Sequence, residues 1–268
     1  MKHYTIQQIV LENKEGFRHM SGEGKVVIMN TQTREVIYTP PKPQELNLLL
    51  NDLEKFINDR QSCTLDPLIK MALIHHQFES IHPFYDGNGR VGRIINILYL
   101  ILNQFLDTPI LYLSRYINHN KEDYYRLLQE VRDKDKWEEW VIYMLEGVSL
   151  TAQSTLSLIE EIKTLLQKQK HKIRNDLPKI YSQDLLNNLF KHPYTKIQFL
   201  VDDLNISRAT ATRYLEALTQ KGILEKQRLG RESYYLNQEL INLLFNIPQI
   251  SKTENNSEAS TRIPVQSV

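Results

Sequence analysis

The first clear pattern along the chain is an alternation of apolar and polar residues over positions 26–38, VVIMNTQTREVIY. β-Branched residues alternate on both sides of a polar centre at 30–34, a pattern that predicts a β-hairpin. Pro40, Pro41 and Pro43 follow it directly. Because proline lacks an amide donor, these residues should end the hairpin and introduce a helix.

From there the apolar residues recur at helical spacing, so the chain is expected to be mainly α-helical up to about residue 172. His82 interrupts this pattern, because it precedes Pro83 and proline disfavours helix at the residue before it. We therefore expect His82 at a turn between two helices. The predicted helices begin near Leu46 and cover about 68–79, 94–105, 121–131 and 137–172.

The pattern changes character after Pro178. A short helical pattern covers 196–203, and Ser207 is a suitable N-cap for a second helix that ends at Gly222. Alternating segments around Leu229-Gly230-Arg231 then predict a small hairpin. Residues 178–247 are therefore expected to form a separate winged helix-turn-helix domain.

Composition and charge indicate the broad class of protein. The chain has 268 residues, a formal net charge of +1 and one cysteine, Cys63, which excludes an internal disulfide and fits a reducing cytoplasm. No apolar run is long enough to cross a bilayer, and the start lacks the apolar core of a secretory signal. Residues 249–268 are rich in small polar groups and are expected to be disordered.

Residues 82–93, HPFYDGNGRVGR, gather the chemistry of a phosphate site. The segment 87–89 can turn backbone amides toward an anion at the start of the next helix, where the helix dipole adds positive potential. Arg90 and Arg93 are three residues apart and share a helix face. Asp86 is a hard oxygen ligand suited to Mg²⁺, and His82 can accept a proton from a hydroxyl.

This segment resembles the signature of the Fic family, H-x-F-x-[D/E]-G-N-G-R-x-x-R, at every specified position. The resemblance extends from about Phe17 to Leu166, and the domain after it looks like the C-terminal domain of the SoFic-like subgroup. It implies a Fic domain over 1–172: a helical core with a small hairpin flap.

The resemblance also implies an activity, the transfer of AMP from ATP to Ser, Thr or Tyr hydroxyls of proteins, this chain included, with release of pyrophosphate. His82 would be the general base and Asp86 the Mg²⁺ ligand. Arg93 would hold the γ-phosphate, and the flap would hold a target segment as an added strand. The expected ATP-binding residues are Asp86, Gly87, Asn88, Gly89, Arg90, Val91, Gly92 and Arg93, with Tyr124 and Tyr125 as walls for adenine or ribose.

Many relatives carry an inhibitory helix, [S/T]-x-x-x-E-[G/N], whose glutamate pairs with the second arginine of the motif. No Glu-Gly or Glu-Asn pair in this sequence has Ser or Thr four positions before the glutamate. The chain also begins close to the flap, so we expect the region that precedes the flap in two-domain relatives to be missing, or inhibition to come from another chain. Arg93 should then be available to ATP.

Two alternatives to AMP transfer stay open at this stage. The same fold supports removal of AMP or another phosphotransfer, and the winged helix could make the chain a DNA-binding regulator or a toxin-type module. Basic residues barely outnumber acidic ones in the second domain, and a homodimer is also open. The candidate DNA contacts are Arg208, Thr210, Thr212, Arg213, Arg228 and Arg231.

Overall fold

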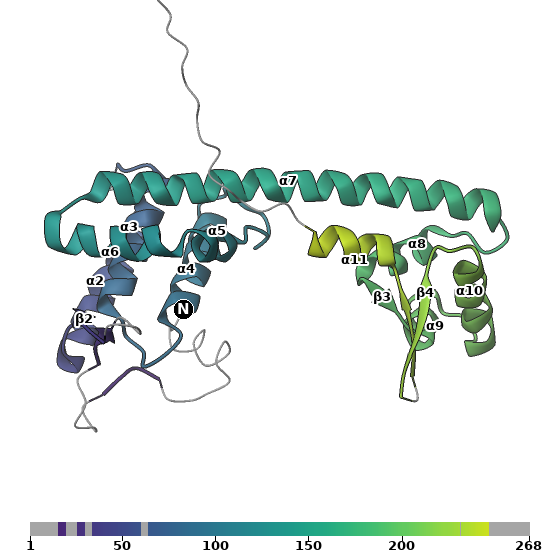
Figure 1. Ribbon diagram of the computed structural model, residues 1–268, viewed down its shortest axis with the longest axis horizontal. Helices are drawn as coiled ribbons and strands as arrows, with labels where there is room; N and C mark the ends of the chain where they lie inside the picture. The colour runs from purple at the N-terminus through teal and green to yellow at the C-terminus, as the bar shows by residue number, and fades with distance from the viewer. Residues whose placement is uncertain (1–15, 20–25, 30–33, 60–63, 231, 247–268) are drawn as a thin grey trace, which may run out of the picture.

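A computed structural model describes residues 16–19, 26–29, 34–59, 64–230 and 232–246 of the chain (Figure 1). The predicted hairpin is present as strands β1 (Ile28–Met29) and β2 (Val36–Tyr38), which pair antiparallel with Ile28 opposite Tyr38. Residues 30–33 of its turn lie outside the described part, as does the tail from 247 to 268, so the expectation of disorder there stays a prediction.

The first domain is a bundle of helices, so the prediction of a mainly helical fold is confirmed. The one-turn helix η1 (Pro43–Glu45) leads into α2 (Leu46–Asn58), and a long helix closes the bundle. The remaining helices are α3 (Pro67–Ile81), α4 (Asn88–Leu102), α5 (Leu113–His119), α6 (Lys121–Lys134) and α7 (Trp137–Asp176).

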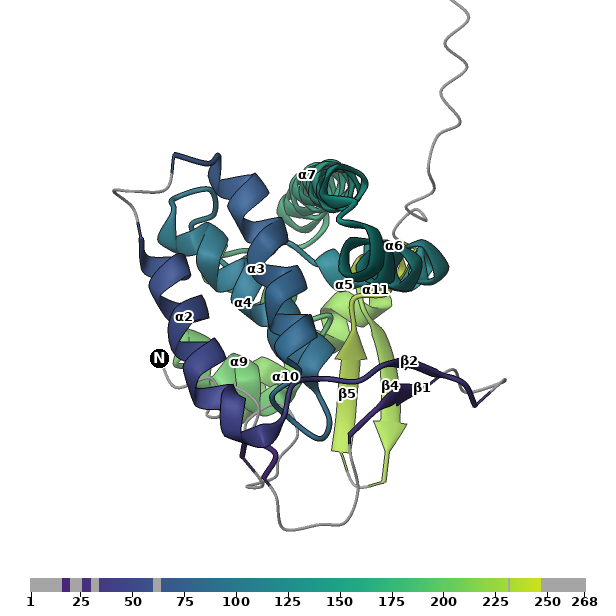
Figure 2. The same ribbon diagram turned by 90° about the vertical axis from the view of Figure 1, so that its left-hand side faces the viewer.

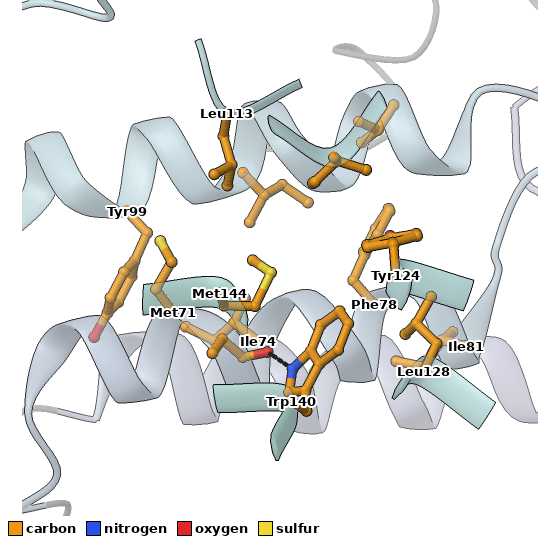
Figure 3. Packing of buried hydrophobic residues seen from close by; sticks show 14 of the residues in the cluster. Met71, Ile74, Phe78, Ile81, Tyr99, Leu113, Tyr124, Leu128, Trp140 and Met144 are labelled. Atoms are coloured by element: carbon orange, nitrogen blue, oxygen red, sulfur yellow. Dashed lines mark hydrogen bonds between the residues drawn. The ribbon is translucent and has the colours of Figure 1, made fainter. Parts of the chain in front are cut away.

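The core of this bundle forms where α3 packs against α4 and α7. Fully buried Phe78, Met71 and Ile74 project from α3, and Trp140 of α7 lies against them (Figure 3). The Trp140 indole donates a hydrogen bond of 2.9 Å to the Ala72 carbonyl, which satisfies its one polar atom. This packing fixes the position of α3, whose end carries His82.

A second buried core lies between Ile173 and Tyr235, around a pair of helices and a small antiparallel sheet (Figure 2), and its description as a separate winged helix-turn-helix domain stays a prediction. Helix α9 (Ile197–Leu204) and helix α10 (Arg208–Gln220) form the predicted helix pair, and the Ser207 hydroxyl caps α10 by accepting from the Thr210 amide. The wing is β4 (Glu225–Leu229) with β5 (Glu232–Leu236). Three further elements of this part of the chain were not predicted from the sequence: α8 (Gln183–Lys191), β3 (Tyr194–Thr195) and α11 (Gln238–Phe245).

Helix α7 runs along both domains (Figure 1). Its first turns contribute Trp140 and Met144 to the first core, whereas Leu166 and Ile173 pack in the second core. Gln169 also bonds Asn237 near the start of α11 at 2.9 Å. The change of core therefore falls inside a continuous helix. No helix in the described part of the chain combines the length and apolar character needed to span a membrane.

Candidate active site

The loop between α3 and α4 is held by the side chain of Asn88. Its Oδ1 accepts from the Phe84 amide and its Nδ2 donates to the Phe84 carbonyl, both at 2.9 Å. Gly87 adopts a left-handed φ of 82°, which costs glycine little, and helix α4 begins at the next residue. The Asn88 side chain therefore builds the loop, and only its backbone can serve an anion.

Three backbone amides at the start of α4 are free of the loop's own bonds, so the anion site stays a prediction, with Gly87 excluded from it. The Gly87 amide donates to Asp86 Oδ1 at 2.6 Å, so the loop itself uses it. The Val91 amide makes the first helical bond, to the Gly87 carbonyl. The amides of Asn88, Gly89 and Arg90 precede that bond, and such amides bind anions at helix N-termini.

His82 lies at the turn that the sequence predicted, as the residue that caps α3. It has a left-handed φ of 49° and its amide still bonds the Phe78 carbonyl. The ring Nδ1 lies 3.3 Å from the Glu79 carbonyl. A carbonyl only accepts, so Nδ1 carries the proton and Nε2 keeps a lone pair. Burial, with Arg18 and Arg132 nearby, lowers the pKa of His82 to about 4, so the ring is neutral at pH 7.

Arg18 holds this turn in place, a role the sequence did not reveal. The side chain is buried, and its Nε donates to the His82 carbonyl at 2.8 Å. Its Nη2 donates to the carbonyls of Ile81, at 3.2 Å, and of Pro41, while its backbone amide bonds the Pro83 carbonyl. One side chain thus fixes the residues around an uncommon backbone conformation.

Asp86 and Arg90 form an exposed ion pair of 3.2 Å across one turn. The Asp86 side chain is 77% exposed, so a cation has open access to it. Mg²⁺ commonly uses one or two carboxylates together with substrate phosphates and water. A single accessible carboxylate beside an amide-lined anion site fits that donor set.

Arg93 is held by a hydroxyl and not by an acid. Its Nε donates to Ser114 Oγ of α5 at 2.7 Å, and no ion pair of Arg93 occurs among the described residues. The expectation that Arg93 lacks the counter-charge of an inhibitory glutamate stays a prediction. Arg93 also lines the cavity next to this loop.

A cavity of about 440 Å³ is lined both by residues of the motif and by residues of the flap. Ile28 of β1 and Ile37 of β2 form part of its wall, so the flap faces the site as predicted. Val91 and Gly92 do not line it, which corrects their assignment as ATP-binding residues: both are buried where α4 packs on α3. The motif residues that line it are His82, Asp86, Gly87, Asn88, Gly89, Arg90 and Arg93.

The two tyrosines of α6 have different surroundings. Tyr124 is 3% exposed and its hydroxyl lies 2.9 Å from His75 Nε2, so most of its ring belongs to the core. Tyr125 is 53% exposed at the cavity wall. A role in stacking on a base stays a prediction for both and suits the accessible ring of Tyr125 better.

Two charged residues of the cavity escaped the sequence analysis, Glu79 and Arg132. Glu79 is buried on α3 and Arg132 comes from the last turn of α6. The Arg132 guanidinium lies 3.8 Å from the centre of the Tyr38 ring and donates from Nε to Ser80 Oγ at 3.1 Å. Nothing in local spacing marks these residues, because α3 and α6 meet only through tertiary packing.

His75 and His76 of α3 are buried in the core of the helical bundle. Burial lowers the pKa of His75 to about 3 and of His76 to about 4, so both are neutral. No cluster of three or more His, Cys, Asp or Glu able to hold a metal occurs in the residues that the structure describes. A larger apolar cavity of about 830 Å³ between α2, α3 and α7 has no residue of the motif in its lining.

The candidate DNA contacts lie on α10 and the wing, and DNA binding stays a prediction. Arg208 and Arg228 are exposed, but the Thr212 hydroxyl bonds the Arg208 carbonyl and Thr210 bonds Ser207. Four lysines of this region form ion pairs with its own acids, which reduces the charge offered to phosphates. The pairs are Lys168–Glu239, Lys191–Asp203, Lys196–Glu232 and Lys226–Glu216. Arg213 lies beside Tyr214, and Arg231 is outside the described residues.

A helical core with a hairpin over the loop that carries His82, followed by a helix pair and a second hairpin, resembles the fold of Fic-domain proteins. Residues 4–100 match the model of the Fic/DOC family, and residues 165–240 match that of the C-terminal domain of SoFic-like protein adenylyltransferases. Over these residues the chain is similar to the Fic/DOC family and to the C-terminal domain of SoFic-like protein adenylyltransferases.

The similar proteins agree with this assignment. The protein adenylyltransferase Fic of Drosophila melanogaster is 43% identical over 58 residues, 22% of this chain and 12% of the fly protein. The protein adenylyltransferase fic-1 of Caenorhabditis elegans is 33% identical over 78 residues, 29% of this chain and 15% of that protein. The chain thus spans a small part of these relatives.

A solved structure supports the fold. The crystal structure of a Fic family protein from Desulfovibrio desulfuricans G20 superimposes with a TM-score of 0.51 at 20% identity, over 87% of this chain and 67% of the other. At this identity the likeness concerns the arrangement of the helices, not the chemistry.

Proposed function

We propose that this protein transfers AMP from ATP to Ser, Thr or Tyr hydroxyls of proteins, including its own, and releases pyrophosphate. The observation that carries the proposal is the state of His82: a neutral ring with Nδ1 on a carbonyl and Nε2 left as a proton acceptor at the wall of an anion cavity. The relatives named protein adenylyltransferase support the same chemistry.

In the proposed reaction, His82 Nε2 takes the proton of the target hydroxyl. The hydroxyl oxygen forms a bond to the α-phosphorus, the bond from that phosphorus to the bridging oxygen breaks, and pyrophosphate leaves with the electron pair. The amides at the start of α4 and Arg93 neutralise phosphate charge, and most of the catalysis is positioning and charge stabilisation. Mg²⁺, held by Asp86 when bound, would neutralise further charge on the phosphates.

The flap is proposed to hold the target. Its strands are short and β2 is mostly exposed, with Ile37 43% accessible next to the cavity. An extended peptide can add to such an edge through its backbone, with the side chains of the flap selecting position. Ile37→Asp should therefore weaken labelling of a protein target while leaving nucleotide binding unchanged.

The test is incubation of the purified chain with ATP and Mg²⁺, followed by mass spectrometry. An AMP adduct supports the proposal, whereas a phosphate adduct supports the alternative phosphotransfer. His82→Ala should lower the rate of adduct formation by about 10²- to 10⁴-fold, the usual contribution of a general base, with nucleotide affinity retained. His119→Ala, on the exposed end of α5, is the matched control. Undiminished labelling by His82→Ala would refute the assigned base.

A further inference from the structure

Glu79 is a buried acid at the wall of the cavity that the proposed reaction does not use. Its side chain lies one turn before the end of α3, and the residue is 7% exposed. Its Oε1 is buried and has no hydrogen-bond partner among the described residues. An ionisable group in this state needs a compensating charge or a proton.

Arginines from two different helices act electrostatically on Glu79. A Cβ placed on Gly89 would lie 3.1 Å from Arg93 Nη1 and 3.7 Å from Glu79 Oε1, so the acid and this arginine of α4 approach the same point. Arg132 of α6 also acts on Glu79 electrostatically. Neither arginine forms an ion pair with Glu79 in the described part of the chain.

Hydroxyl groups hold both arginines independently of Glu79. Arg93 Nε donates to Ser114 and Arg132 Nε donates to Ser80. The other titratable groups around the acid are His75 and His82 of its own helix and Tyr124 of α6, all neutral at pH 7. Arg93 and Arg132 are therefore the charges that decide whether Glu79 is ionised.

We propose that Glu79 is a positioning residue that acts through Arg93 and Arg132: it balances their charge in the empty site and takes up a proton from solvent when nucleotide phosphates occupy the site. This inference rests on the proposed function, because it requires a polyphosphate in the cavity. The phosphates would neutralise the arginines and add negative charge, and both changes favour the protonated acid.

In the free protein, Glu79 can gain or lose a proton near neutral pH. Burial raises the pKa of Glu79 to about 7, with Arg93 and then Arg132 opposing the rise. At pH 7.5 a group with this pKa is about three-quarters ionised, so complete protonation on binding takes up about 0.75 proton per nucleotide. By the same linkage, nucleotide affinity should weaken by up to about tenfold per pH unit above pH 7.

The experiment is calorimetric titration of the full chain with α,β-methylene-ATP and Mg²⁺ at pH 7.5, in HEPES and in Tris. The two buffers differ in ionisation enthalpy, so the difference in measured heat gives the number of protons taken up. We expect an uptake of about 0.75 in the native chain and near zero in Glu79→Gln, whose affinity should be independent of pH between 7 and 9. Glu122→Gln, an exposed acid of α6, should behave like the native chain.

Zero uptake by the native chain, or equal uptake by Glu79→Gln, would overturn the inference while leaving AMP transfer intact. If Glu79→Gln does not fold, Arg132→Gln provides the second test. Without that guanidinium the acid should already be more protonated in the empty site, so uptake should fall below half of the native value, and an unchanged uptake would refute the proposal. Failure of the nucleotide to bind at all would refute the proposed function and this inference with it.

Discussion

Arg18→Ala tests the idea that one buried side chain holds the turn that carries His82. The substitution removes the guanidinium that donates to the carbonyls of Ile81, His82 and Pro41. Hydrogen bonds to charged groups contribute about 1.5–3 kcal/mol each, and a buried carbonyl left without a donor costs about 1–3 kcal/mol. The desolvation of Arg18 in the native protein offsets part of this sum. We expect a loss of about 3 kcal/mol in the free energy of unfolding.

The two tryptophans make the measurement specific to the domain that carries Arg18. Trp137 and Trp140 are the two tryptophans of the chain, and both lie at the start of α7 in the first domain. Urea unfolding followed by tryptophan fluorescence therefore reports the helical core rather than the winged helix. Arg126→Ala is the matched control, since its exposed ion pairs with Asp123 and Glu130 should contribute less than about 1 kcal/mol.

Arg18→Ala should also affect the site beyond stability. His82 has a left-handed backbone that needs support from its surroundings, so its ring should lose its alignment when Arg18 is removed. AMP transfer under conditions where the variant is folded should fall by about 10²-fold, as is typical for a misplacement near 1 Å. A loss in unfolding free energy below that of Arg126→Ala, or native labelling rates, would refute this account of Arg18.

The remaining predictions concern pH, packing, the metal and self-modification. Because the pKa of His82 is lowered to about 4, its ring stays neutral at pH values where an ordinary histidine is protonated. The first-order rate of AMP transfer at saturating ATP should therefore stay level from pH 8 to 5.5. A fall of about tenfold over that range would indicate a pKa near 6.5. His75, His76 and His82 all have lowered pKa values, so the unfolded chain binds more protons, and the urea midpoint should decrease as pH falls from 6.5 toward 4. In Gly147→Ala the new Cβ would lie 2.6 Å from Tyr116 Cδ1, and this overpacking should cost about 1–3 kcal/mol in urea unfolding; a stabilised variant would show that α5 moves freely. Asp86→Asn should abolish the Mg²⁺ dependence of labelling while the thermal midpoint stays native, because the side chain is 77% exposed; labelling that still rises with Mg²⁺ would exclude Asp86 as the ligand. Since Arg93 is bonded to Ser114, the native chain should label itself with AMP without any activating substitution, and an unlabelled but folded protein would count against this.

The sequence predicted those parts of the site that depend on neighbours along the chain. Pro83 placed His82 at a turn, and the glycines beside Asn88 placed an anion loop at the start of a helix, because proline and glycine act on the local backbone. The flap could be predicted from its alternation. The helix pair of the winged helix could be predicted from Ser207 as an N-cap and from Gly222 at the end of the second helix.

The parts that could not be predicted arise from packing between distant segments. Arg18 reaches the catalytic turn across 64 positions of the chain, and Arg132 reaches Ser80 across 52. Gly92 belongs to the same motif as the ligands, yet its missing side chain serves helix packing: a Cβ there would lie 2.9 Å from Glu79 Oε1. A motif alone does not distinguish a glycine that faces a phosphate from one that faces a neighbouring helix.

The number of residues in helix α7 sets how the second domain is rotated about the helix axis relative to the first domain. The helix has 40 residues and is therefore about 60 Å long, at 1.5 Å per residue. Its two ends pack in different cores, so the residues between them form a rigid helical connection. Inserting one alanine near Gln153 would turn the winged helix about 100° around the axis of α7 and leave both cores intact. Seven inserted residues would return the winged helix nearly to its original orientation. Any surface that the winged helix offers to a partner thus has an angle relative to the flap that is set by residue count.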